Sequence, residues 1–235
     1  MQGSVHRLSF FSRHLNCEKN LFIYLPPSYF HREDLYYSCV YSLPGLLDYE
    51  ATWCEKGRLN EVMDTLIAHG QIGEMVVVMP DKDNVSTNPM EEFYFAHYLA
   101  TDLREYVESN FRVIPVNRHR GVEGLSLGAS WALKLATNLP GLYCSVGILS
   151  TQFTEESYQD VEENLAELQH NNTRFLLSAG TGEANIIPSN QHFCGFLRER
   201  GLDAHFFIEE GPHDWPLWQK VIYKTLCFHY RSFNP

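Results

Sequence analysis

The sequence predicts the α/β fold class, with a mostly parallel central sheet that carries helices on both faces. From about residue 36 onward, short apolar runs alternate with stretches of helical period, a pattern typical of parallel strands joined by crossover helices. The run Met75–Met79 is continuously apolar and ends at Pro80, as expected of a strand buried on both faces. In Gly57–His69 the apolar residues recur at the spacing of an amphipathic helix: Leu59, Val62, Met63, Leu66 and Ile67.

The predicted strands are short runs rich in β-branched and aromatic residues. Two of them precede the first helix, and the turn-like sequence PPSYFHRED separates them. The others alternate with helices, as parallel strands do. In chain order the predicted strands are Leu21–Pro26, Tyr36–Leu43, Met75–Met79, His119–Leu125, Val146–Leu149, Phe175–Ser178 and His205–Ile208.

The predicted helices have apolar residues three and four positions apart. Gly70 follows the first of them and is a residue type that commonly ends a helix. The segment Asp81–Phe95 is long and ends in aromatic residues, so we expect a loop that lines a binding site. The predicted helices are Gly57–His69, Leu99–Val107, Ala129–Thr137, Val161–Leu168, Asn190–Arg198 and Pro216–Tyr230.

Length and composition indicate one domain over residues 1–235. A single hydrophobic core stops growing only at roughly 250–300 residues, and 44% of the residues are hydrophobic. Acidic residues outnumber Lys plus Arg by 29 to 18, so the average field of the molecule repels phosphate backbones and anionic lipids. We therefore expect neither nucleic acid nor a membrane as a partner. A homo-oligomer is compatible with the sequence.

Export signals, disulfide patterns and cofactor motifs are not found in the sequence. Residues 1–12 mix polar and apolar side chains, and no run of about 18 apolar residues occurs. The six cysteines form no CxxC pair, which favours reduced thiols. Neither HExxH nor GxxxxGK[ST] is present, and GTGEAN only begins a GxGxxG pattern. The sequence predicts a cytoplasmic location and no required metal or cofactor.

Ser126 lies in a GxSxG motif between Gly124 and Gly128. A predicted strand ends at this motif and a predicted helix follows it. A hydrolase needs its serine on such a sharp strand-to-helix turn, and flanking glycines let the backbone bend without Cβ clashes. The alternative is a glycine-rich turn whose serine only caps the helix. The setting favours Ser126 as the nucleophile of an α/β-hydrolase.

His213 and Glu183 are the predicted partners of this serine. A serine hydroxyl passes its proton to a base, usually histidine, and His213 follows the last predicted strand, where this fold presents its base. A carboxylate must accept the other ring N–H. Glu183 is the only carboxylate in the loop AGTGEAN, which follows the strand Phe175–Ser178. Three carboxylates close to His213 in sequence stay open as alternatives: Asp203, Glu209 and Asp214.

An oxyanion hole needs two backbone N–H donors, one after the nucleophile and one in a loop after an early strand. Leu127 supplies the first. The second is assigned to Leu46, because the preceding Pro44-Gly45 pair lets the backbone turn inward.

Several segments of the chain together resemble the esterase D and Putative esterase family of α/β-hydrolases, which includes tributyrin, feruloyl and enterochelin esterases and S-formylglutathione hydrolases. The resemblance runs from about residue 21 to residue 218. In chain order, the segments that carry it are IYLPPSY, SLPGLLDYEATW, KGRLNEVMDTLIAHGQIGEMVVVMPD, GLSLGASWAL, AGTGEA and GPHDWPLW. It implies a serine carboxylesterase with Ser126, Glu183 and His213 as the triad, and with the Leu46 and Leu127 amides as the oxyanion hole.

The chain departs from this family at several positions. Pro44-Gly45 replaces a common His-Gly pair, Glu183 replaces the usual aspartate, and Ala129 and Trp131 stand where small glycines usually follow the nucleophile. The departures at Pro44, Ala129 and Trp131 motivate a second interpretation, a catalytically silent binding domain of the same fold. Acyl transfer or thioester hydrolysis with the same triad is a third.

The substrate is expected to be a small-molecule ester with a small or short acyl chain. Only about one helix fits between the predicted strands that end at Leu149 and begin at Phe175, so a large cap domain is not expected and the pocket should be open. Trp53 and Tyr94 are the residues predicted to line this pocket.

Overall fold

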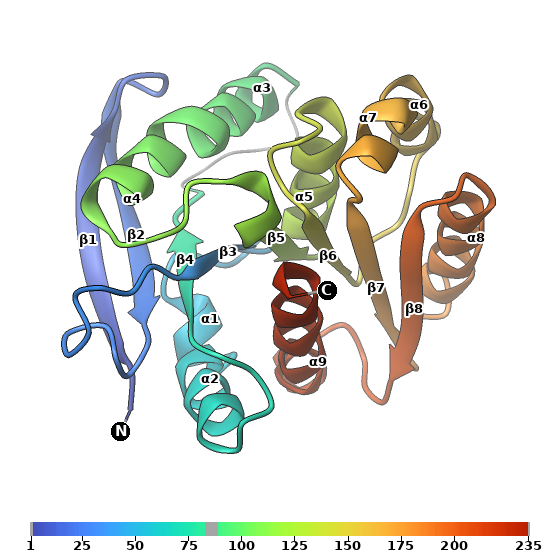
Figure 1. Ribbon diagram of the computed structural model, residues 1–235. Coiled ribbons are helices and arrows are strands. Elements are labelled where there is room, and N and C mark those ends of the chain that lie inside the picture. Colours follow the sequence, from blue (N-terminus) through green and yellow to red (C-terminus); the bar gives the residue numbers. More distant parts are fainter. Residues whose placement is uncertain (1, 83–88, 235) are drawn as a thin grey trace.

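Eight strands form one sheet in the computed structural model, which describes residues 2–82 and 89–234, apart from the side chains of residues 89–93. The strand order is β1-β2-β4-β3-β5-β6-β7-β8 (Figure 1). β1 pairs antiparallel with β2 and β2 with β4, and every other pair is parallel. The strands are β1 Ser4–Ser12, β2 Cys17–Leu25, β3 Ser38–Leu43, β4 Met75–Pro80, β5 Arg120–Leu125, β6 Ser145–Leu149, β7 Arg174–Gly180 and β8 Asp203–Glu209. The predicted α/β architecture is confirmed.

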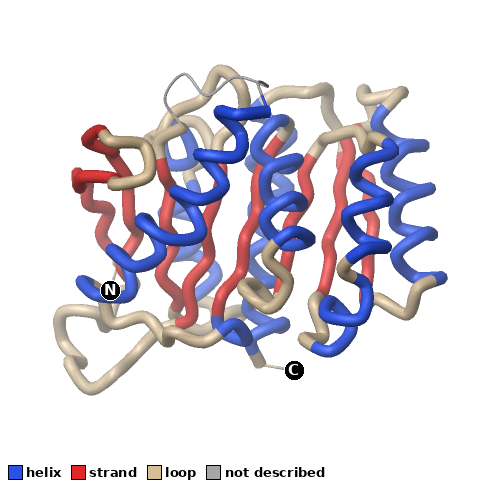
Figure 2. Tube along the Cα trace, turned by 90° about the horizontal axis from the view of Figure 1, so that it is seen from above, coloured by secondary structure: helices blue, strands red, loops and turns tan. Residues whose placement is uncertain are grey.

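Helices cover both faces of the sheet (Figures 1 and 2). On one face lie α1 Thr52–Glu55, α2 Leu59–Ala68 and α9 Trp215–Phe233. On the other lie α3 Pro89–Tyr98, a π-helix Leu99–Leu103, α4 Arg104–Asn110, α5 Leu127–Asn138, α6 Glu155–Glu163, α7 Leu165–His170 and α8 Ile186–Glu199. A short 3₁₀ turn, Asn117–His119, precedes β5. Among the described residues no helix has the length and apolar character needed to cross a membrane.

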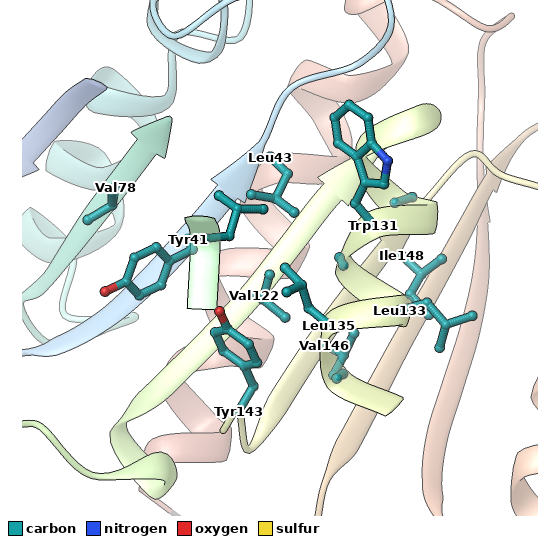
Figure 3. Close-up of a cluster of buried hydrophobic side chains, with 14 of the residues drawn as sticks. Tyr41, Leu43, Val78, Val122, Trp131, Leu133, Leu135, Tyr143, Val146 and Ile148 are labelled. Atoms are coloured by element: carbon teal, nitrogen blue, oxygen red, sulfur yellow. The ribbon is translucent and has the colours of Figure 1, made fainter. Parts of the chain in front are cut away.

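The strands alternate their side chains between two hydrophobic layers. On β4, Val76 and Val78 belong to the layer under α5, whereas Val77 and Met79 belong to the layer under α9. Figure 3 shows the first layer, where strand residues such as Val122 face α5. Full burial of one such aliphatic side chain is worth about 1.5–3 kcal/mol. The all-apolar composition of β4 thus follows from its burial on both faces.

Strand β1 was not predicted from the sequence. Its outer residues Arg7, Ser9 and Phe11 are exposed, while Leu8 and Phe10 pack against the core. This period-two alternation is the mark of a half-buried strand, but polar residues interrupt it too often for an apolar run to stand out. The antiparallel pairing with β2 is what places β1 at the edge of the sheet.

Two predictions, one of a helix and one of a loop, need correction. The predicted helix Val161–Leu168 is two helices, because the backbone leaves helical geometry at Asn164, which ends α6 and precedes α7. The predicted loop Asp81–Phe95 becomes helical from Pro89 onward as α3, and its residues 83–88 lie outside the described part of the chain. The other predicted elements are present with shifted ends.

A cluster of buried polar side chains joins strands β3, β5 and β6 to α9. The Ser42 hydroxyl of β3 donates to Glu123 of β5 at 2.7 Å, and His229 Nε2 of α9 lies 3.5 Å from the second Glu123 oxygen. The other ring nitrogen of His229 shares a hydrogen bond of 2.7 Å with Ser145 of β6. Gly147 leaves the space for this pair, because a Cβ there would lie 2.8 Å from the Glu123 Cβ. These fully buried side chains tie three adjacent strands to one helix.

Replacement of Glu123 by Ala should destabilise the fold strongly. It leaves His229 and Ser42 in the interior without the carboxylate that they contact, and a buried polar group left without a partner costs about 1–3 kcal/mol. Urea unfolding measures the change in the free energy of unfolding. The matched control is Glu18→Ala, at an exposed site on β2, where we expect a change within about 0.5 kcal/mol. Equal effects of the two substitutions would contradict a structural role for the buried group.

Candidate active site

Ser126 lies on a sharp turn between β5 and α5. Its backbone has φ 53° and ψ −116°, a conformation that residues other than glycine adopt only at a cost of about 1–3 kcal/mol. The Ser126 N–H donates to the carbonyl of Leu149 at the end of β6, at 2.8 Å. The strained turn is thus fixed to the neighbouring strand, and it lifts the serine hydroxyl off the end of the sheet.

Gly124 and Gly128 are required by close backbone approaches at this turn. A Cβ at Gly124 would lie 2.1 Å from the carbonyl oxygen of Gly128. A Cβ at Gly128 would lie 2.5 Å from the carbonyl oxygen of Leu43 and 2.6 Å from that of Pro44. All three distances are too short for any side chain. The glycines of the GxSxG motif therefore let α5 start directly against β5 and against the loop that follows β3.

His213 lies between Ser126 and Glu183. Its Nε2 is 3.1 Å from the Ser126 hydroxyl, and its Nδ1 is hydrogen-bonded to Glu183 Oε1. The second carboxylate oxygen of Glu183 accepts the backbone N–H of Gly180 at 2.5 Å. The side chain of Glu183 is 2% exposed, against 41% for His213. A shielded carboxylate therefore orients an accessible imidazole toward an accessible hydroxyl.

The three alternative carboxylates are engaged elsewhere. Asp203 pairs with Arg174 at 2.6 Å and with His205 at 2.8 Å. Glu209 accepts from Lys224 at 2.8 Å, and this hydrogen bond lowers the pKa of Glu209. The side chain of Asp214 caps α9 by accepting the N–H of Leu217 at 3.3 Å. Of the four candidates, only Glu183 is hydrogen-bonded to His213 in the described structure.

The two predicted oxyanion donors lie on segments that meet at the turn. Leu127 is the first residue of α5, so its N–H is one of those that a helix leaves without an internal acceptor. Leu46 follows β3, in the loop whose Pro44 carbonyl lies against the first turn of α5. Within the described part of the chain, neither amide has a protein acceptor. Both are thus available to a developing negative charge.

The two predicted pocket residues differ in exposure. Tyr94 on α3 is 46% exposed, as a substrate contact requires. Trp53 on α1 is 0% exposed and packs edge-on against Trp215, with ring centroids 5.8 Å apart. This burial contradicts the prediction that Trp53 contacts a ligand. Trp53 instead supports the ring of Trp215.

Two tryptophans beside the histidine were missed in the sequence. Trp218 lies edge-on to the His213 ring at 4.9 Å and donates its N–H to Ser150 at 3.0 Å. Trp215 packs against Trp218 at 5.5 Å. The signal was present in HDWPLW, because residues three apart at the start of a helix share a face. Trp218 therefore limits the orientations of the imidazole, and Trp215 supports Trp218 from its other side.

Cys39 and Cys54 are unsuited to nucleophilic chemistry, and no metal cluster is found in the described residues. Burial raises the pKa of Cys39 to about 12 and of Cys54 to about 11, so these thiols stay protonated at neutral pH and are poor nucleophiles. No cluster of three His, Cys, Asp or Glu side chains within residues 2–82 and 89–234 could hold a metal ion.

Comparisons with known proteins identify the family and agree with the fold. A sequence model of the family described as Putative esterase matches residues 12–228. The uncharacterized protein YjcH of Bacillus subtilis (strain 168) is 24% identical over 95% of this chain and 96% of its own length. A solved structure named ferulic acid esterase is 25% identical and superposes with a TM-score of 0.86, over 98% of this chain and 99% of the other. S-formylglutathione hydrolase (FrmB) from Staphylococcus aureus shares the fold, with 17% identity and a TM-score of 0.77 over 98% and 100% of the two chains.

The close approach at Gly128 predicts the effect of a single methyl group there. Gly128→Ala should lower the free energy of unfolding by about 1–3 kcal/mol, because the added Cβ pushes α5 away from the loop after β3. Gly195→Ala is the matched control, since a Cβ at Gly195 of α8 meets nothing within 4 Å, and we expect a gain of roughly 0.5–1 kcal/mol there. Urea denaturation measures both. A Gly128→Ala protein as stable as the control would refute the steric argument.

Proposed function

Because the chain belongs to the Putative esterase family, it is a serine esterase of the α/β-hydrolase fold, and we propose that Ser126, His213 and Glu183 are its catalytic triad. The observation that carries this proposal is the continuous hydrogen-bonded series from hydroxyl to imidazole to carboxylate. The same series argues against a catalytically silent domain, since a binding module has no need of a strained serine aimed at a histidine.

The reaction follows from these contacts. The Ser126 hydroxyl attacks the ester carbonyl carbon while His213 Nε2 takes its proton. The tetrahedral oxyanion is stabilised by the N–H groups of Leu46 and Leu127. The C–O bond to the alcohol then breaks as His213 returns the proton to the leaving oxygen. A water molecule, deprotonated by the same imidazole, then attacks the acyl-enzyme. The acid is released as His213 returns the proton to the Ser126 oxygen.

Glu183 has an electrostatic task in this scheme. It accepts the Nδ1–H of His213, which leaves Nε2 free to accept the serine proton, and it stabilises the imidazolium that forms. Burial of its carboxylate excludes competing water, so the attraction to the imidazolium is screened less than it would be at the surface. An uncharged replacement of the same shape would hold the ring in the wrong tautomer.

The proposed substrates are small-molecule esters with small or short acyl chains. The connection from β6 to β7 holds only the short helices α6 and α7, which leaves no room for a large cap over Ser126. Aromatic esters are the second class to test, because the 25% identical neighbour is named a ferulic acid esterase. Acyl transfer and thioester hydrolysis use the same triad, and product analysis with alcohol and thiol acceptors separates them. The cytoplasmic location and the absence of nucleic-acid and membrane partners stay predictions from the sequence.

Replacement of Ser126 by Ala tests the nucleophile. The hydrolysis rate of p-nitrophenyl acetate should fall by roughly 10⁵–10⁶-fold, because the covalent step is lost while binding remains. Covalent labelling by a fluorophosphonate probe should disappear in the same variant, with the thermal unfolding curve kept as a control for folding. Labelling that persists in Ser126→Ala would place the nucleophile elsewhere.

Glu183→Gln tests the acid against its alternatives. We expect kcat to fall by roughly 10⁴-fold, as the amide favours the wrong imidazole tautomer. The matched controls are Asp203→Asn and Asp214→Asn. The second keeps the helix cap, because an asparagine oxygen can also accept the Leu217 N–H, so we expect little change in stability or in kcat. Assays on the same ester compare all three, and a larger kcat loss in either control would reassign the acid.

A further inference from the structure

A hydrogen bond connects the loop of the oxyanion donor to the loop of the catalytic base. The indole N–H of Trp215 donates to Asp48 Oδ1 at 3.1 Å, across 167 residues of sequence. Asp48 lies two residues after Leu46, and Trp215 lies two residues after His213. No other hydrogen bond between the loop 44–51 and residues 211–216 is found in the described structure. The position of one loop thus depends on the other through this contact.

Asp48 is held on the oxyanion side of this contact. Its side chain is 7% exposed, its N–H donates to the Gly45 carbonyl at 3.2 Å, and Lys56 Nζ lies 3.6 Å from Oδ1. A Cβ at Gly45 would lie 2.8 Å from Asp48 Oδ2, so the carboxylate is folded back against the backbone that precedes Leu46. Any shift of the Asp48 carboxylate would therefore be transmitted to the Leu46 amide.

Trp215 is held firmly on the other side. Its ring packs edge-on against both Trp53 and Trp218, and a Cβ at Gly57 would lie 2.8 Å from its Cζ3 atom. The missing side chain at Gly57 therefore makes room for the indole. Trp218 in turn contacts the His213 ring. An indole held on three sides presents its N–H in one direction, which suits it to anchor a loop.

We propose that Asp48 and Trp215 are positioning residues for the oxyanion hole. Their hydrogen bond fixes the Leu46 N–H relative to Ser126 and His213, so that the donor meets the oxyanion as it forms. This inference rests on the proposed function. Asp48 acts as a hydrogen-bond acceptor, and Lys56 offsets its negative charge, which would otherwise oppose the developing oxyanion.

The expected effect is on kcat rather than on KM. A backbone donor that moves away from the oxyanion weakens the transition state but leaves ground-state binding nearly unchanged. Loss of a whole donor costs roughly 10²–10³-fold in kcat. Misplacement of the Leu46 amide should therefore cost about 10- to 100-fold.

The test compares four variants with the wild type on p-nitrophenyl acetate: Asp48→Ala, Asp48→Asn, Trp215→Phe and the double variant Asp48→Ala/Trp215→Phe. Asp48→Ala and Trp215→Phe should each lower kcat by about 10- to 100-fold, with KM changed by less than about threefold. Asp48→Asn keeps the acceptor oxygen and should restore kcat to within about threefold of the wild type. The double variant should be no slower than the worse single variant, because both remove the same contact.

Two further measurements complete the test. Asp34→Ala removes an exposed carboxylate that pairs only with Arg32, and its kcat should stay at the wild-type value. Hydrogen exchange of the amides in residues 44–49 should accelerate in Asp48→Ala and Trp215→Phe but not in the control. A wild-type kcat in both single variants, losses that multiply in the double variant, or failure of Asp48→Asn to restore activity would each overturn the proposal. If the wild type hydrolyses no ester, the proposed function fails, and hydrogen exchange alone decides whether the contact positions the loop.

Discussion

The backbone turn at Ser126 is the constraint on which the rest of the site depends. The residue adopts a left-handed φ that a serine does not favour, and the close backbone approaches around this turn need glycine at positions 124 and 128. The same close approaches bring the first turn of α5 against the carbonyls after β3. One strained residue therefore determines both the direction of the proposed nucleophile and the proximity of the two segments that carry the proposed oxyanion donors.

Most of the fold could be predicted from the sequence, because strands that are buried on both faces are recognisable as continuous apolar runs. Continuous apolar runs such as Met75–Met79 and glycines such as Gly124 reflect contacts that tolerate nothing else. Ser126 and His213 could be placed because each follows a predicted strand. Glu183 could be favoured over its alternatives by its loop, although only the structure shows that Asp203 and Asp214 have other partners.

What could not be predicted depends on contacts between distant segments. Strand β1 is stabilised by its pairing with β2 rather than by its own composition. The burial of Trp53 follows from the position of Trp215, more than 160 residues away in sequence, and periodicity carries no record of such a pairing. Helix α9 makes several of these long-range contacts. Trp218 in its first turn packs against His213, and His229 lies against the buried Glu123.

The two hydrogen bonds of Glu183 have a consequence for how this site can change during evolution. One carboxylate oxygen holds the imidazole, and the other holds the Gly180 amide of its own loop. An aspartate is one methylene shorter, so from this backbone position it could not serve both partners without a shift of the loop. Either glutamate or aspartate can orient the imidazole, but exchanging one for the other would require the surrounding loop to change as well. Lineages that carry glutamate here should therefore keep it together with the length of this loop.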